Sequence, residues 1–93
     1  MDRDEALALL RSQHPFPGPF DFRVVILPAA RSGVLSAMSA AAGPEAALLA
    51  VDERASSQGT YLSLRVRMSL PDAENVLHVY EILRDLEGVK TAL

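Results

Sequence analysis

Polar and apolar residues alternate strictly between Tyr61 and Leu70, and this pattern constrains the fold more than any other feature of the chain. Five alternations in a row seldom arise by chance, and they predict a β-strand with one apolar and one polar face. A strand of this kind belongs to a sheet that packs one side on a core. The apolar face would carry Leu62, Leu64, Val66, Met68 and Leu70, and the polar face Tyr61, Ser63, Arg65, Arg67 and Ser69.

The flanking segments supply partners for this strand. Pro28 should end a first strand, Ser32 is expected to cap a helix, and Gly43-Pro44 should stop that helix. The predicted helices are Asp4 to Ser12, Ser32 to Ala42 and Asp72 to Leu86, and the predicted strands beside Tyr61 to Leu70 are Phe20 to Leu27, Ala46 to Glu53 and Val89 to Leu93.

The segment Ala46 to Glu53 is ambiguous, because its alanines and leucines favour a helix on propensity alone. We expect a strand, since the topology requires one there. After the N-terminal helix the order is then β-α-β-β-α-β, and its helical crossovers predict parallel central strands. The predicted fold class is α+β, a ferredoxin-like sandwich whose four-stranded antiparallel sheet is ordered 4-1-3-2, with two helices on one face and a short extra N-terminal helix.

Composition limits the classes of functional site that the chain can form. A length of 93 residues fits one domain over 1–93, and the sequence has no cysteine for disulfides or thiolate sites. His14 lies in a proline-rich segment, His78 lies on a predicted helix and no cysteine is present, so we expect no metal and no cofactor. No Gly-x-Ser-x-Gly elbow is present, and we expect no catalytic residues and no enzyme activity. A net charge of −3 argues against nucleic-acid binding.

Two segments bear on localisation. The first five residues are acidic overall and no apolar core of signal-peptide length follows them, so we expect no secretory signal. The most apolar long stretch, Gly33 to Ala50, is interrupted by Pro44 and Glu45, which argues against a membrane span. The sequence therefore predicts a cytoplasmic protein.

Three segments in order resemble one known family. They are FPGPFDFRV at Phe16 to Val24, ASSQGTYLS at Ala55 to Ser63 and LEGVK at Leu86 to Lys90. Together they resemble the YbeD-like family of small bacterial proteins of unknown biochemical role, over about Leu10 to Leu93. The resemblance implies a fold like that of ACT regulatory domains and a proposed link to lipoate metabolism. It implies no catalytic residues.

Arginines provide the first candidate site. Arg65 and Arg67, with Arg23 on the neighbouring strand, should project from the sheet face that the helices leave open. Guanidinium groups bind carboxylates and phosphates, so this face is a candidate surface for a ligand or partner. The alternative is an ordinary solvated sheet face. An RNA-binding sheet of this topology carries stacked aromatics, whereas only Tyr61 is placed to do so here.

The loop that precedes Tyr61 is the second candidate. Gly59 permits a positive φ, and the hydroxyls of Ser56 and Ser57 with nearby backbone N–H groups could hold an anion. The loop lacks the lysine and the helix start of a phosphate loop. The alternative is a hairpin turn in which the serines satisfy backbone groups.

Self-association is the third expectation. Ala46 to Val51 forms an uncharged edge strand, and Val25, Leu27, Leu48 and Ala50 should lie on or beside the open face unless the N-terminal helix covers them. We expect a homodimer through a sheet edge or the open face. The function that fits is a non-enzymatic regulatory or adaptor module acting through self-association and contact with a protein partner. The alternative is a small-molecule-sensing ACT-like dimer that binds a small carboxylate metabolite, in lipoate metabolism.

Overall fold

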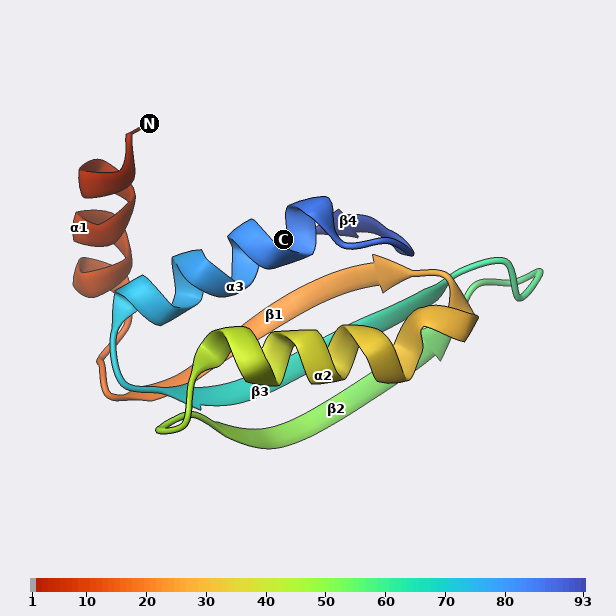
Figure 1. The fold of residues 1–93 in the computed structure, drawn as a ribbon, viewed down its shortest axis with the longest axis horizontal. Helices are drawn as coiled ribbons and strands as arrows, with labels where there is room; N and C mark the ends of the chain where they lie inside the picture. Colours follow the sequence, from red (N-terminus) through yellow and green to blue (C-terminus); the bar gives the residue numbers. More distant parts are fainter. Residues whose placement is uncertain (1) are drawn as a thin grey trace.

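The computed structural model describes residues 2–93 and has an α+β architecture in which one sheet is covered on a single face by helices (Figure 1). The sheet has four strands in the order β2-β3-β1-β4, which confirms the predicted ferredoxin-like, ACT-like order 4-1-3-2. The elements are α1 (Arg3–Gln13), β1 (Gly18–Ile26), the 3₁₀ turn η1 (Pro28–Ala30), α2 (Arg31–Ala42), β2 (Ala47–Ala55), β3 (Leu62–Leu70), α3 (Ala73–Asp85) and β4 (Val89–Ala92).

The two central strands, β1 and β3, are antiparallel, and β3 is also antiparallel to β2. The expectation of parallel central strands was therefore wrong. A helical crossover does make the two strands that it joins parallel, but here a third strand lies between them. The parallel relation consequently holds for β1 and β2, which are not neighbours.

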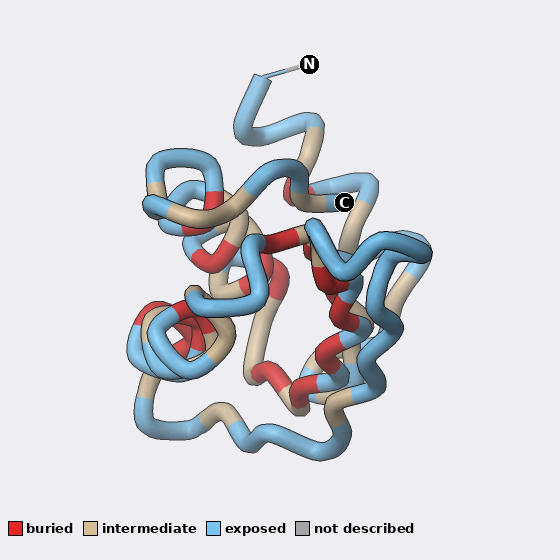
Figure 2. Tube along the Cα trace, turned by 90° about the vertical axis from the view of Figure 1, so that its right-hand side faces the viewer, coloured by how far each residue is buried: buried red, intermediate tan, exposed pale blue. Residues whose placement is uncertain are grey.

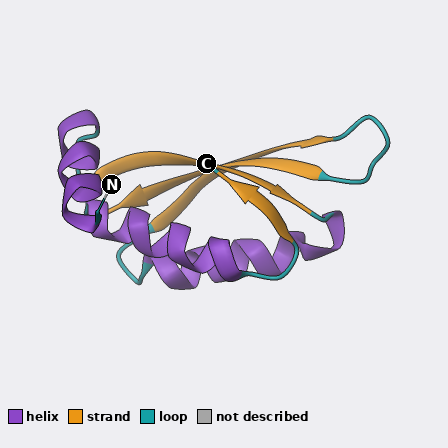
Figure 3. Cartoon of the chain, turned by 90° about the horizontal axis from the view of Figure 1, so that it is seen from above, coloured by secondary structure: helices purple, strands orange, loops and turns teal. Residues whose placement is uncertain are grey.

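The core lies between the sheet and the pair α2 and α3, as seen from above in Figure 3 and by burial in Figure 2. On β3 every predicted apolar member is buried, and Val66 and Leu70 are 0% exposed. The face of β1 that adjoins them contributes Phe22, Val24 and Ile26. The helices add Val34, Met38, Ala41 and Ala42 from α2 and Val76, Val79 and Leu83 from α3. Burying one large aliphatic side chain contributes roughly 1.5–3 kcal/mol.

One amide joins the two covering helices. The Asn75 Oδ1 accepts a hydrogen bond of 3.1 Å from the backbone N–H of Asp72 at the start of α3. The Nδ2 of the same side chain donates a bond of 3.0 Å to the carbonyl of Ala42, the last residue of α2. Gly43 then leaves the helix with φ of 96°, a conformation that glycine adopts without steric cost. The end of α2 is thus fixed against the beginning of α3.

The predicted cap at Ser32 was wrong. Helix α2 begins at Arg31, and the residue at its N-cap position is Ala30, which makes no side-chain capping bond. The reason is the 3₁₀ turn η1, which starts at Pro28 and continues directly into α2. The residue before α2, Ala30, therefore already has a helical backbone conformation. The Arg31 N–H bonds the Pro28 carbonyl, so no side-chain cap is needed there.

Helix α1 packs on α3 rather than on the open face. Arg3 forms an ion pair with Glu81, and Arg11 forms one with Asp72 at 3.1 Å. Leu7 is the buried residue of this helix. Figure 3 places α1 at one end of the helical layer, so it does not cover the open face of the sheet.

A β-bulge in β2 corrects the placement of Leu48. The register between β2 and β3 shifts between Leu48 and Ala50, so Leu48 lies opposite Met68 and Ala50 opposite Arg67. Opposed residues of an antiparallel pair share a face, which places Leu48 on the helix side of the sheet. It had been expected together with Ala50 on or beside the open face. Leu27, expected in the first strand, follows the end of β1 at Ile26.

Introducing a charge at the centre of the core tests this architecture. Val66→Asp should prevent folding, because an unpaired carboxylate would enter a fully apolar site at a cost comparable with a domain's whole stability of roughly 5–15 kcal/mol. Ser63→Asp is the matched control, since it adds the same carboxylate to an exposed position of the same strand. Circular dichroism and thermal unfolding should show a cooperative transition only in the control. A cooperatively unfolding Val66→Asp protein would contradict the placement of β3.

Candidate functional site

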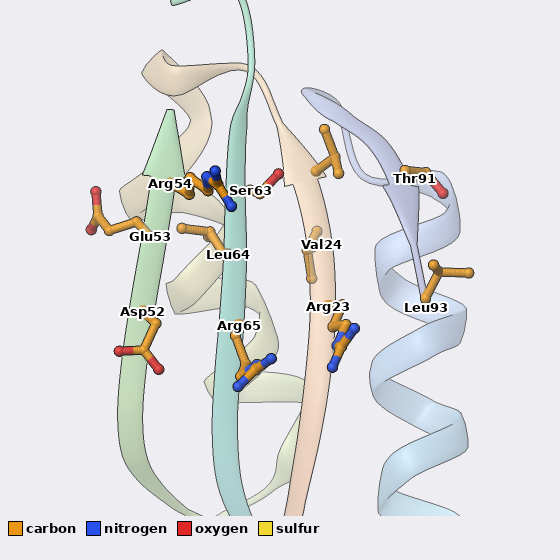
Figure 4. Close-up of a pocket in the computed structure, with 11 residues that line it drawn as sticks. Arg23, Val24, Asp52, Glu53, Arg54, Ser63, Leu64, Arg65, Thr91 and Leu93 are labelled. Carbon is orange, nitrogen blue, oxygen red and sulfur yellow. The ribbon is translucent and has the colours of Figure 1, made fainter. Parts of the chain in front are cut away.

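The face of the sheet turned away from α2 and α3 carries a shallow hollow of about 480 Å³, which we call the open-face hollow (Figure 4). It spans all four strands, and its wall combines charged, hydroxyl and apolar groups. The lining residues are Arg23, Val24 and Val25 on β1, Asp52, Glu53 and Arg54 on β2, Ser63, Leu64 and Arg65 on β3, and Thr91 and Leu93 at the C-terminal end.

Strand register places two arginines directly opposite each other. Arg23 of β1 faces Arg65 of β3, and both side chains are exposed. On its other side Arg65 faces Asp52 of β2, yet within residues 2–93 neither Arg23 nor Arg65 has an acidic oxygen within the 4.0 Å of an ion pair. Like charges directly opposite on neighbouring strands destabilise a sheet. The hollow therefore contains two opposed guanidinium groups, neither of which forms an ion pair with a residue of the described chain.

The third predicted arginine is engaged differently. The Nε of Arg67 donates to Asp21 Oδ1 at 2.8 Å, and its terminal Nη2 donates to Oδ2 at 3.2 Å. These bonds, the attraction of Arg67 and the nearby charges of Arg65 and Arg23 hold the pKa of the Asp21 carboxyl below its ordinary value of 3.8, against the opposing effect of burial. Arg67 is not among the residues that line the hollow. The three predicted arginines thus divide into one ion-paired group and two without a partner.

The loop candidate lies apart from the hollow. Its four predicted residues, Ser56, Ser57, Gly59 and Tyr61, belong to the hairpin between β2 and β3, and none of them lines the hollow. Ser56 is used inside the turn: its Oγ accepts a bond of 3.1 Å from the Tyr61 N–H, and its carbonyl accepts one of 2.9 Å from Gly59. Gly59 has φ of 71°, as the turn requires. The Ser56 side chain therefore satisfies the backbone, whereas Ser57 is exposed.

Tyr61 takes part in a different contact. The ammonium of Lys90 lies 5.9 Å from the centroid of the Tyr61 ring, within the range of a cation–π interaction. The contact joins Lys90 of β4 to the residue that precedes β3, and neither Lys90 nor Tyr61 lines the hollow.

Sequence reasoning missed several lining residues. Arg54 was placed beyond the end of its strand, which was expected to stop at Glu53, but β2 extends to Ala55 and Arg54 lies opposite Ser63 on the open face. Thr91 was assigned to the last strand without a facing direction, and the register now sets it beside Val25. Alternation counted from the correct strand ends could have identified both residues.

The net charge of the open face has the opposite sign to the net charge of the whole chain. Arg23, Arg54, Arg65 and Arg67 stand against Asp21 and Asp52, so the face is net positive on a chain whose net charge is −3. Guanidinium groups with neighbouring hydroxyls at Ser63 and Thr91 are donors that suit carboxylates or phosphates. In the described part of the chain no group of His, Cys, Asp and Glu is arranged to hold a metal ion. None of the helices described there is long and apolar enough to cross a membrane.

The thermal stability of single variants can test whether Arg67 is ion-paired and Arg65 is not. Arg67→Ser should lower the thermal midpoint and raise the pKa of Asp21 back toward 3.8, because the bonds that stabilise the ionised carboxylate are lost. Arg65→Ser should leave the midpoint unchanged or raise it, because it removes one member of a like-charged pair. Differential scanning fluorimetry and an NMR titration of Asp21 measure these quantities.

The stability that Arg67 provides through Asp21 depends on pH. A depressed carboxyl pKa contributes stability at neutral pH that is lost as the pH falls through the folded-state value. The difference between wild type and Arg67→Ser should therefore shrink below about pH 3.8. Equal midpoints for the two arginine variants at neutral pH would contradict the assignment.

Comparison with known proteins supports the fold and gives the family. No curated protein matches the chain. The structure is similar to the solution structure of the C-terminal domain of the MgtC protein from Mycobacterium tuberculosis, with a TM-score of 0.70 over 87% of this chain and 88% of that one. The sequence identity is 13%, so the similarity shows a shared ACT-like fold. A family model described as "Protein of unknown function (DUF493)" matches residues 11–93. The chain therefore belongs to the DUF493 family, which is the YbeD-like family that its sequence resembles.

Proposed function

We propose that this protein is a non-enzymatic regulatory module of the cytoplasm that self-associates and binds an acidic segment of a protein partner on the open face of its sheet. The observation that carries the proposal is the opposed pair Arg23 and Arg65, neither of which forms an ion pair within residues 2–93. The family and the ACT-like fold are consistent with a regulatory role.

The energetic argument concerns charge balance. Two guanidinium groups held opposite each other repel, and the free protein bears that cost. A carboxylate placed between Arg23 and Arg65 would relieve the repulsion and accept charge-assisted hydrogen bonds from both groups. Because the pair lies on the two central strands, little backbone ordering opposes binding. Binding energy is therefore concentrated at these two residues.

The shape of the surface favours a protein segment over a small ligand. Small-molecule sites are usually concave and bury most of the ligand, whereas this hollow is shallow and its two arginines are exposed. An extended acidic segment could contact the hollow along its length and place several carboxylates over the face.

A small carboxylate metabolite is the second candidate. The observation in its favour is the presence of apolar Val25 and Leu93 among the residues that line the hollow with Arg23. A fatty carboxylate such as octanoate or lipoate would place its charged end at the arginines and its chain on these apolar groups. This candidate retains the proposed link to lipoate metabolism.

The binding experiment uses single substitutions that change net charge equally. Fluorescence anisotropy with a labelled glutamate octapeptide should give binding to wild type at low salt, weakened about tenfold or more by Arg23→Ser and by Arg65→Ser. Arg84→Ser is the matched control, because Arg84 is exposed on α3 and lies outside the open face. The affinity of Arg84→Ser for the peptide should stay within about twofold of wild type, since the charge that it removes lies far from the open face.

Thermal shift with octanoate and lipoate separates the two candidates. A raised melting temperature that is lost in Arg23→Ser, without peptide binding, would favour the metabolite. Equal peptide affinity in all three variants would mean that the open face is ordinary solvated surface and the proposed site is wrong.

A further inference from the structure

The outer edge of β2 is available for pairing with another strand. This strand is nine residues long and lies at the end of the sheet order β2-β3-β1-β4, with eight of its residues exposed (Figure 1). Natural edge strands are commonly protected by charged side chains, above all lysine, by proline or by a bulge, and the sequence of β2 contains neither lysine nor proline. Its bulge at Leu49 disturbs the N-terminal half only, which leaves Val51 to Ala55 regular. The three charged residues of β2 lie in this regular C-terminal half.

The hydrogen-bond pattern shows which backbone groups face outward. The Ser56 N–H donates to the Tyr61 carbonyl at 2.9 Å, so this opposed pair is a hydrogen-bonded pair. Such pairs alternate along an antiparallel ladder, which means that Asp52 and Arg54 direct their backbone groups toward β3. Val51, Glu53 and Ala55 consequently direct theirs toward the free edge.

The side chains of the same half alternate in charge. Asp52 and Arg54 lie on the open face, opposite Arg65 and Ser63, and within residues 2–93 neither has an ion-pair partner. Glu53 lies on the helix side, where its carboxylate is bound by Arg31 of α2 at 2.6 Å. In Figure 4, Glu53 is drawn on the outer side of β2, and Asp52 is drawn over the strand itself.

We propose that β2 pairs antiparallel with β2 of a second copy, around a two-fold axis at Glu53, so that two sheets join into one of eight strands. In this register the Glu53 backbones exchange both hydrogen bonds across the axis, and Val51 pairs with the partner's Ala55. Asp52 then lies opposite the partner's Arg54, and by symmetry Arg54 lies opposite the partner's Asp52. These are non-hydrogen-bonded pairs, in which side chains approach most closely.

Charge selects this register over its neighbours. Moving the axis by one residue toward the N-terminus would set Asp52 opposite the partner's Asp52. Moving it by one residue toward the C-terminus would set Arg54 opposite the partner's Arg54. Both alternatives keep the outward backbone groups paired but oppose like charges, which is destabilising. The two Glu53 carboxylates near the axis are each neutralised by Arg31 of their own chain.

The open face itself does not provide such an interface. Four arginines and two aspartates give it a net positive charge, so two copies placed face to face would repel. The edge therefore accounts for the self-association in the proposed function, on which this inference rests. Because the two-fold axis stands perpendicular to the sheet, both open-face hollows lie on the same side of the dimer.

The experiment exchanges the charges of the edge. Sedimentation velocity at about 100 µM should show a wild-type dimer. D52R would place an arginine at position 52 opposite the partner's Arg54, and R54D would place an aspartate at position 54 opposite the partner's Asp52. Because like charges then face each other, each variant alone should be monomeric at that concentration. An equimolar mixture of D52R and R54D should recover the dimer, because each position 52 then faces an opposite charge at position 54. The double variant D52R/R54D should also dimerise. Circular dichroism controls for folding.

Three results would overturn the edge proposal: a monomeric wild type, single variants that remain dimeric, or a mixture that stays monomeric. Arg84→Asp serves as a control, since it changes the net charge as much as R54D does, at an exposed position of α3 away from the edge of β2. Peptide anisotropy with Arg23→Ser and Arg65→Ser is measured on the same preparations. Arginine-dependent peptide binding by a monomeric wild type would contradict the edge alone, and a dimer without peptide binding would contradict the open-face site alone.

Discussion

Burial of one face of β3 is the constraint on which the rest of the structure depends. Val66 and Leu70 are fully buried, and their strand has a neighbour on each side, so its apolar face must be covered by α2 and α3. Because side chains alternate along a strand, the same burial directs Arg65 and Arg67 to the opposite face. The arrangement of the arginines is therefore a geometric consequence of the core. A shift of one residue in register would exchange the two faces and is excluded by the cost of burying charge.

The local patterns of the sequence identified most of the fold, because alternation and turn residues are properties of single segments. Every α-helix and strand was located, and the strand order followed from the order of the elements along the chain. Errors arose where one segment depends on another. The bulge that turns Leu48 to the helix side is visible only in pairing with β3, and the cap expected at Ser32 was displaced by the turn that begins at Pro28.

The candidate site was less accessible to such reasoning. Alternation placed Arg23, Arg65 and Arg67 on one face, but it could not distinguish them, because pairing across strands depends on register. Register gives Arg67 an aspartate and gives Arg65 an arginine as its neighbour on β1. Register thereby separates an ion-paired arginine from one that forms no ion pair within residues 2–93, although both lie on the same face of β3. The sheet tolerates the unfavourable pair because the apolar burial beneath it is far larger than a surface repulsion.

The positive open face of a negatively charged molecule also has a kinetic consequence. Charge of one sign on one side and of the other sign elsewhere gives the protein an electric dipole moment. In the field of an acidic partner the molecule would rotate during diffusion so that the arginines lead, which raises the fraction of encounters that are productive. This orientation acts over about one Debye length, roughly 8 Å at physiological ionic strength. Added salt should therefore slow association more than it speeds dissociation.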